Sequence, residues 1–258
     1  MRGVGAARFG LCLLFHLLLA TLPLRAEQIV AGLSQSNIAI TANYVGSEIL
    51  IFGAIQRDAP APDGPLEVVI TLEGPSGPLT VRRKTHVNGI WVNTDKLIIS
   101  RAPHFYAVST TTPLSSALSA TEDLRHHVSI PRAIRAVGAA SVDESPRYFD
   151  ALIRLRKAEG LYQLQEGTVD LAQNTLFRTS IILPANLAEG SYKTRIFLTR
   201  GGQVVDTLET SIMVQKEGLE RWLFALAHEQ PVAYGSLSLA IAILAGWAAA
   251  AVFRMFWA

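Results

Sequence analysis

The sequence predicts a mainly β fold: an immunoglobulin-like β-sandwich with a helical middle segment and one C-terminal transmembrane helix. Three observations support this prediction. Short runs of β-branched residues, separated by Gly- and Pro-rich turns, fill residues 27–114 and return in residues 161–215. Residues 115–160 have helical periodicity instead. Residues 234–253 contain no charged side chain, and a helix of that length can cross a bilayer.

Residues 1–26 have the order of a secretory signal. Arg2 and Arg8 precede an apolar run from Phe9 to Leu22, and Leu24-Arg25-Ala26 follows as a cleavage-site pattern. The alternative is that this segment stays as a second membrane helix, but about 14 apolar residues are few for a span. In either case the middle of the chain is expected to be exported.

The charge argues against nucleic-acid binding, and the cysteine content argues against disulfides and cysteine-ligated metal. The net charge of +2 includes Arg2, Arg8 and Arg25, so loss of the signal leaves 20 basic and 21 acidic side chains. We therefore expect no nucleic-acid partner, because such proteins usually carry a clearly basic domain. The single cysteine, Cys12, lies in the signal, which predicts an exported part without disulfides or cysteine-ligated metal.

Residues 27–114 are predicted to form the first β-sandwich-like region. Turns are expected at 57–65 and 74–78, which are rich in Gly and Pro. Trp91 is expected to face the core, since large aromatic side chains are usually buried; its exposure as a ligand platform is the alternative. The strands expected in this region include 48–54, 66–72, 79–83, 90–93 and 105–108.

Residues 115–160 are predicted to be helical and to cover a sheet. A helix opening near Pro113 places four apolar residues roughly on one side: Leu114, Leu118, Leu124 and Val128. Residues 131–137 add one or two turns. A second helix is expected to begin at Ser145, with Pro146 in its first turn and Gly160 beyond its end. Its apolar stripe is Phe149, Leu152 and Ile153.

Residues 161–215 form the second predicted β-rich region. Strands are expected at 176–183, 191–199 and 206–214, with a hairpin turn at 200–203. The string Ala188 to Arg195 resembles the strand entry of immunoglobulin-like domains, where a tyrosine hydroxyl, here that of Tyr192, caps a corner.

Residues 216–230 are predicted to form a juxtamembrane amphipathic helix, and residues 231–258 the membrane anchor. Four residues make the apolar face of the first: Leu219, Trp222, Leu223 and Leu226. This face is expected at the headgroup level, although it could instead dock on the sandwich. Arg254 after the span and Glu229 before it predict a cytoplasmic C-terminus. Small residues that would allow close helix packing are Gly235, Ser236, Ser238, Ala245, Gly246 and 248–251.

The sequence predicts no catalytic, cofactor-binding or metal site, and we expect that the protein is not an enzyme. His126 and His127 are adjacent, so on a helix they point about 100° apart. His86 and His104 could approach each other across strands, but two histidines without a third ligand make a poor metal site. A triad could be sought among Ser115, Ser116, Ser119, Asp123 and His126; capping and a solvated face explain this cluster better.

Basic groups are dispersed through the predicted fold. If they converged, their guanidinium groups could hold an oxyanion. The alternative is that they form solvated positive faces. These groups are Arg82-Arg83-Lys84, Arg132 with Arg135, and Arg154, Arg156 and Lys157.

Several runs together resemble a family of alphaproteobacterial putative transmembrane proteins of about this length, which have a signal and a C-terminal span. The runs are Thr80–Lys84, Gly89–Asn93, Phe105–Val108, Gly190–Tyr192 and the span. The resemblance implies localisation and architecture, and it carries over no catalytic residues. It also implies neighbouring sulfite-exporter-type permeases, and hence an accessory role in anion export.

Two classes of function are therefore expected. The first is a non-catalytic interaction module or accessory subunit, with its domain in the periplasm, its span in the bacterial inner membrane, and the lipid bilayer and an integral membrane protein such as a permease as partners. The alternative is a periplasmic oxyanion-binding or sensing domain in which the arginines and Trp91 line a pocket. An enzyme would require a deep pocket with groups of perturbed pKa, for example around His104 or His126.

Overall fold

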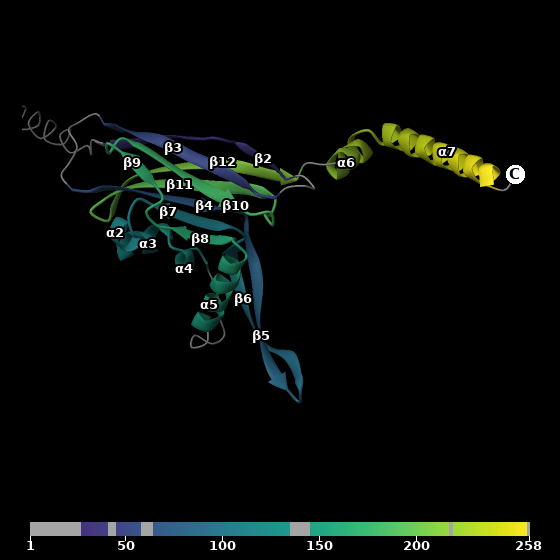
Figure 1. The fold of residues 1–258 in the computed structure, drawn as a ribbon. Coiled ribbons are helices and arrows are strands. Elements are labelled where there is room, and N and C mark those ends of the chain that lie inside the picture. The colour runs from purple at the N-terminus through teal and green to yellow at the C-terminus, as the bar shows by residue number, and fades with distance from the viewer. Residues whose placement is uncertain (1–26, 41–44, 58–63, 135–144, 217–218, 257–258) are drawn as a thin grey trace, which may run out of the picture.

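The computed structural model describes residues 27–40, 45–57, 64–134, 145–216 and 219–256 (Figure 1). The predicted signal, residues 1–26, lies outside the described residues. Two sheets stack face to face, a two-stranded arm projects from them, and two helices at the C-terminus lead away from the body (Figure 1). The protein is thus mainly β with one long apolar helix, as predicted.

The sandwich consists of a four-stranded and a six-stranded sheet. The four-stranded sheet has the order β1 (Glu27–Leu33), β3 (Ser47–Arg57), β10 (Leu176–Leu183), β9 (Asp170–Ala172). The six-stranded sheet has the order β2 (Asn37–Ile40), β12 (Gln203–Lys216), β11 (Gly190–Arg200), β4 (Leu66–Glu73), β7 (Tyr106–Thr110), β8 (Tyr162–Gln165). Because β3 pairs with β10 and β4 pairs with β11, strands from both β-rich regions build one sandwich.

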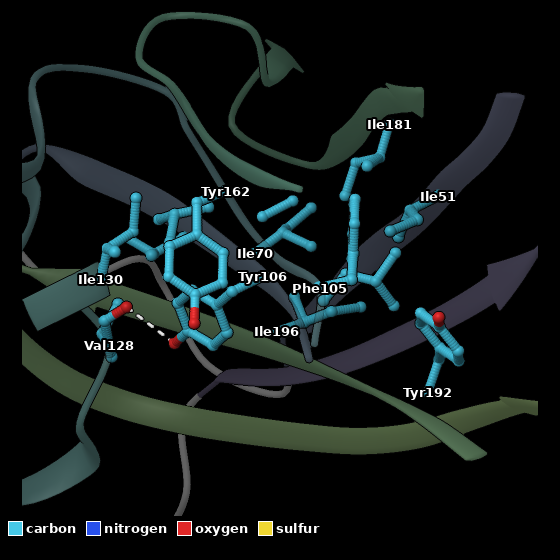
Figure 2. Close-up of a cluster of buried hydrophobic side chains, with 14 of the residues drawn as sticks. Ile51, Ile70, Phe105, Tyr106, Val128, Ile130, Tyr162, Ile181, Tyr192 and Ile196 are labelled. Atoms are coloured by element: carbon cyan, nitrogen blue, oxygen red, sulfur yellow. Dashed lines mark hydrogen bonds between the residues drawn. The ribbon is translucent and has the colours of Figure 1, made fainter. Parts of the chain in front are cut away.

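The main core lies between the two sheets and follows the alternation of their strands. Inward residues of β3 and β10, such as Ile51 and Ile181, meet Ile70 and Ile196 of the six-stranded sheet (Figure 2). All four side chains are fully buried. Side chains two positions apart share one face of a strand, so each strand contributes several apolar groups to this layer.

Short helices cover the outer face of the six-stranded sheet. They are α2 (Leu114–Ala117), α3 (Ala120–His126) and α4 (Ile130–Ala133), below the sheets in Figure 1. The hydroxyl of buried Tyr106 donates to the carbonyl of Val128 at 2.8 Å (Figure 2). Arg195 of β11 donates to the carbonyl of His126 at 2.7 Å. These bonds hold the C-terminal end of α3 and the residues after it against the sheet.

The expected helix after Pro113 is interrupted. Leu118 has extended backbone dihedrals, and Ser119 starts α3 as its N-cap by accepting a hydrogen bond from the Glu122 amide. The break turns Leu118 into the core and leaves Leu124 exposed, so the predicted apolar side is only partly buried. Residues 135–137 of the next expected turn lie outside the described residues.

The second helix was predicted correctly. Helix α5 runs from Ser145 to Ala158, and Gly160 beyond it has a positive φ of 71°. From the expected stripe, Leu152 is buried, while Phe149 and Ile153 are partly buried against the core.

The strands predicted from β-branched runs are confirmed within a few residues, except that the strand expected at 90–93 continues to Pro103 as β6 (Ile90–Pro103). Strands β1, β2, β8 and β9 were not predicted individually. The hydroxyl of fully buried Tyr192 donates to the carbonyl of Ala188 at 2.8 Å, which is the corner bond that the sequence suggested. The β11–β12 turn was also predicted; Gly201 and Gly202 both have positive φ there.

Two helices follow the sandwich. Helix α6 (Leu219–Glu229) contacts α7 (Pro231–Phe256). Residues Pro231–Arg254 of α7 are long and apolar enough to span a membrane, with a mean hydropathy of 2.1 and none of the apolar window buried in the protein. The predicted transmembrane helix is confirmed.

A buried carboxylate joins the two sheets. Glu27, which starts β1 and is 5% exposed, accepts hydrogen bonds at 2.8 Å from Arg57 of β3 and from Arg200 of β11. A second link lies nearby, because buried Asp206 of β12 accepts from the backbone amide of Ile29 at 2.8 Å. We call the Glu27–Arg57–Arg200 group the Glu27 clamp.

The clamp sets the ionisation of Glu27. Burial alone would raise the pKa of this carboxyl, but the hydrogen bonds and charges of Arg57 and Arg200 outweigh burial and lower the pKa below its ordinary value of 4.5. The folded state therefore favours the carboxylate. The stability that it contributes is present above pH 4.5 and is lost as pH falls through the lower folded pKa.

We expect Glu27→Gln to reduce the free energy of unfolding by about 3 kcal/mol at pH 7, because two arginines would lose their charged partner in a poorly solvated site. The difference from wild type should shrink as pH falls below 4.5. Denaturant unfolding of the full-length chain in detergent, measured across pH, checks this. The control is Glu48→Gln, which removes an exposed carboxylate of β3. A loss that stays constant down to low pH would contradict the role of the charge.

Candidate interaction surfaces

The outer face of the four-stranded sheet carries exposed apolar side chains beside the charged groups Glu48 and Arg178. On the central strand β3, Leu50 and Phe52 point outward, with Phe52 45% exposed; Leu176 of β10 is 58% exposed. Outward positions of a solvated antiparallel sheet are normally polar. We define the apolar face as Val30, Leu50, Phe52, Leu176 and Ile182.

A hollow of about 750 Å³ lies on this face. Its lining comes from β1, β3, β9 and β10, and includes Val30, Phe52, Leu176 and Arg178. The Phe52 ring lies across Gly32 of β1: a Cβ added at Gly32 would come within 3.3 Å of the ring. The absence of a side chain at Gly32 therefore makes room for the aromatic ring of Phe52, which also lines the hollow.

The two outer faces of the sandwich differ. The chain covers the six-stranded sheet with its own α2–α4 layer, whose contacts reach β4 and β7. Among the described residues, no helix lies on the apolar face (Figure 1). An uncovered apolar patch on a folded domain commonly marks a site of interaction.

A second surface is the arm formed by β5 (Ser76–Val87) and β6 (Ile90–Pro103). These strands pair with each other as a separate two-stranded sheet and project from the body (Figure 1). The prediction that Trp91 is buried is wrong: it is 69% exposed near the tip of the arm and contacts the ring of His86. Its strand runs beyond the edge of the sandwich, so no second sheet covers it. The strand expected at 105–108 is confirmed as β7, and the aromatic residues Phe105 and Tyr106 are fully buried.

The predicted basic groups lie on three different elements. Arg82 is on β5, Arg132 on α4 and Arg154 on α5, and all three side chains are exposed. Arg135 lies outside the described residues.

A polar pocket of about 180 Å³ forms elsewhere, at the outer face of the six-stranded sheet. Its cations include Arg101, Lys193 and Arg195. Arg101 pairs with Glu73, and Lys193 pairs with Glu209, so carboxylates neutralise two of these charges. Arg195 donates to the backbone carbonyls of His126 and His127 at the C-terminal end of α3. Because these cations already bind carboxylates or backbone carbonyls, the pocket gives no specific support for an oxyanion site.

The histidines considered for a metal site lie apart. His86 lies near the tip of the arm and His104 at its base, so they do not meet. Burial lowers the pKa of His104, the charge of Arg156 lowers it further, and Glu159 opposes both. Nearby, burial raises the pKa of Tyr162 to about 12. Within the described ranges, no group of three His, Cys, Asp or Glu side chains could hold a metal ion.

Two of the residues considered for a triad stabilise the ends of α3. Ser119 caps α3, and Asp123 accepts hydrogen bonds from the amides of Val128 and Ser129. His126 contacts Glu122 at 3.3 Å and packs on the ring of Phe197. The capping interpretation is therefore confirmed for Ser119, and Asp123 stabilises the turn after α3.

The membrane-proximal helices keep apolar side chains at their surface. Trp222 of α6 is 54% exposed, and α6 stands away from the sheets in Figure 1. Side chains of α7, such as Leu244 and Trp247, are exposed as expected for contact with lipid.

The sequence matches one known protein family over nearly the whole chain. A family described as "Putative transmembrane protein (Alph_Pro_TM)" matches residues 28–255, which include the sandwich, the arm and the span. The chain belongs to this family. The match agrees with the resemblance seen in the sequence, and with the C-terminal apolar helix it establishes a membrane protein.

Similarity to curated proteins and to solved structures is weaker. No curated protein matches the chain. Six chains of solved structures match. One is the crystal structure of Spo0M, a sporulation control protein from Bacillus subtilis, at 10% sequence identity and a TM-score of 0.26. The match covers 74% of this chain and 50% of that protein, so the chain spans half of its length.

Sequence reasoning missed both surfaces, although signals for them were present. Asn88-Gly89 between two β-branched runs is a strong hairpin signal, and both residues have positive φ in the structure. In β3, apolar residues continue without alternation from Ile49 to Phe52, a pattern that predicts burial on both faces. Only the structure shows that one of these faces is uncovered.

The two faces of β10 should respond differently to substitution. We expect Leu176→Ser to change the free energy of unfolding by less than about 0.5 kcal/mol, because this side chain faces solvent. Ile181→Ala, which empties a fully buried position on the same strand, should cost about 2–5 kcal/mol. Denaturant midpoints of the two full-length variants provide the measurement. A comparable loss for Leu176→Ser would mean that the apolar face belongs to the core of the protein.

Proposed function

We propose that this protein is a non-catalytic, membrane-anchored interaction subunit whose apolar face docks on an integral membrane protein. The observation that carries this proposal is the uncovered apolar face with its hollow of about 750 Å³. The fold covers its other sheet with helices, so the exposed sheet is the surface available to a partner. Aromatic and aliphatic side chains such as Phe52 and Leu176 are typical anchors of such contacts.

The fold supports an interaction module of immunoglobulin-like type. The order β1-β3-β10-β9 facing β12-β11-β4 is similar to the A-B-E-D and G-F-C sheets of immunoglobulin domains. The corner bond of Tyr192 is a second point of similarity. Such sandwiches commonly serve as recognition domains, although fold alone does not determine function.

The membrane anchor favours an integral membrane protein as the partner. The sandwich precedes α7 in the sequence, so it lies on the opposite side of the membrane from the C-terminus. From the positions of Arg254 and Glu229, we assign the sandwich to the periplasm and the C-terminus to the cytoplasm of the bacterial inner membrane. Gly235, Ser236 and Gly246 in α7 allow a neighbouring helix to approach closely. The partner we propose is a permease of the anion-exporter type, the class that the family resemblance implies.

Photocrosslinking in native membranes tests the proposal. A photoreactive amino acid in place of Phe52 of the full-length chain should give an adduct with one integral membrane protein, because the Phe52 ring lies in the hollow. The same probe at Leu164, an exposed position on β8 outside the apolar face, should not give it. Mass spectrometry of the adducts provides the identification.

Two further variants make the result specific. Leu176→Asp should abolish the Phe52 adduct by placing a charge on the apolar face, and replacement of residues 234–253 by a generic span should weaken it. If both probe positions gave the same adducts, or if neither gave any, the docking role of the apolar face would be contradicted.

A further inference from the structure

The arm has two chemically different faces. Residues two apart on one strand share a face, and directly paired residues lie on the same face. The pairs Arg82–Lys96, Lys84–Asn93 and His86–Trp91 therefore lie together, and we call them the basic face of the arm. On the opposite face the exposed ion pair Arg83–Asp95 is neutral. At the base of the arm Arg101 pairs with Glu73, so the other three cations, Arg82, Lys84 and Lys96, lie on one side.

The pairing of Arg82 with Lys96 is unfavourable for the arm alone. These two cations are directly opposite each other, both are exposed, and like charges in this position destabilise a strand pair. The Asp95 carboxylate is on the other face and accepts two hydrogen bonds from Arg83. An anion placed between Arg82 and Lys96 would remove this repulsion.

The tip of the arm is apolar on both faces. Asn88 and Gly89 form a two-residue turn with φ of 50° and 88°. Val87 and Ile90 flank the turn on one face, and His86 and Trp91 on the other. Ile90 and Trp91 are 64% and 69% exposed. Apolar groups beside cations, with a tryptophan among them, suit the boundary between headgroups and acyl chains.

The arm leaves the sandwich at the end from which the membrane anchor also leaves. Along β11, Gly190 pairs with Val214 near the end of β12, and Lys193 pairs with Glu73, just before the arm. Between the sandwich and α7 lies α6, whose 11 residues extend about 16 Å. The 12 residues of β5 extend about 40 Å. The arm is therefore longer than the helical connection to the bilayer.

We propose that the arm is a second membrane contact, which binds the anionic lipid surface of the bilayer that α7 spans. Arg82, Lys84 and Lys96 contact lipid phosphates, and Ile90 and Trp91 enter the interfacial layer. Charge complementarity and continuity with the membrane anchor support a lipid surface as the occupant. The contact would fix the tilt of the sandwich over the membrane. It is independent of any partner on the apolar face.

A fluorescent label at the tip tests this contact. The full-length chain with Cys12→Ser and Ile90→Cys is labelled with an environment-sensitive dye and reconstituted into vesicles of phosphatidylcholine, with or without one third phosphatidylglycerol. We expect several-fold higher emission in the anionic vesicles, and quenching there by a nitroxide attached near the lipid headgroup. A label at Leu164→Cys on the sandwich is the control for proximity to the vesicle, and its emission should not change.

Charge variants separate headgroup recognition from simple insertion. Arg82→Gln with Lys96→Gln should abolish the rise in emission. Arg154→Gln with Lys157→Gln removes the same charge from exposed positions of α5 and should leave it unchanged. Water-like emission from the tip in anionic vesicles, equal emission in both lipid mixtures, or equal loss in both double variants would overturn the proposal.

Discussion

The Glu27 clamp is the constraint on which the arrangement of this protein depends. Glu27 is the first residue of β1, and its buried carboxylate binds one arginine from each sheet. Because Asp206 also holds the backbone of β1, the first strand is fixed to both layers of the sandwich. The predicted signal ends directly before this residue. Removal of the signal at that point would leave the clamp at the very start of the folded domain.

The two outer faces of the sandwich differ in what covers them. One outer face is covered by short helices, whose carbonyl ends bind Tyr106 and Arg195 of the sheet beneath. The other outer face presents aliphatic and aromatic groups to its surroundings. The arm and the membrane anchor leave from one end. We infer a division of roles, in which one end meets the lipid and one face meets a partner.

Local patterns predicted the elements well but not their environment. β-branched runs identified β3, β4 and β10, and Pro146 with Gly160 bounded α5, because these signals act within a few residues. Trp91 was misjudged because its burial depends on whether a second sheet extends that far, which is a property of topology. The clamp joins residues 27, 57 and 200, and the apolar face joins strands from both ends of the domain. No local pattern contains such long-range juxtapositions.

The most direct test is the accessibility of the apolar face in cells. A thiol introduced by Ala172→Cys lies at the edge of the hollow, whereas Ala158→Cys lies on the exposed end of α5. A membrane-impermeant maleimide should alkylate the A172C variant several-fold more slowly in intact cells than in purified protein, and the A158C variant at similar rates in both. Equal rates for A172C in cells and in purified protein would show that nothing covers the apolar face, and would contradict the account.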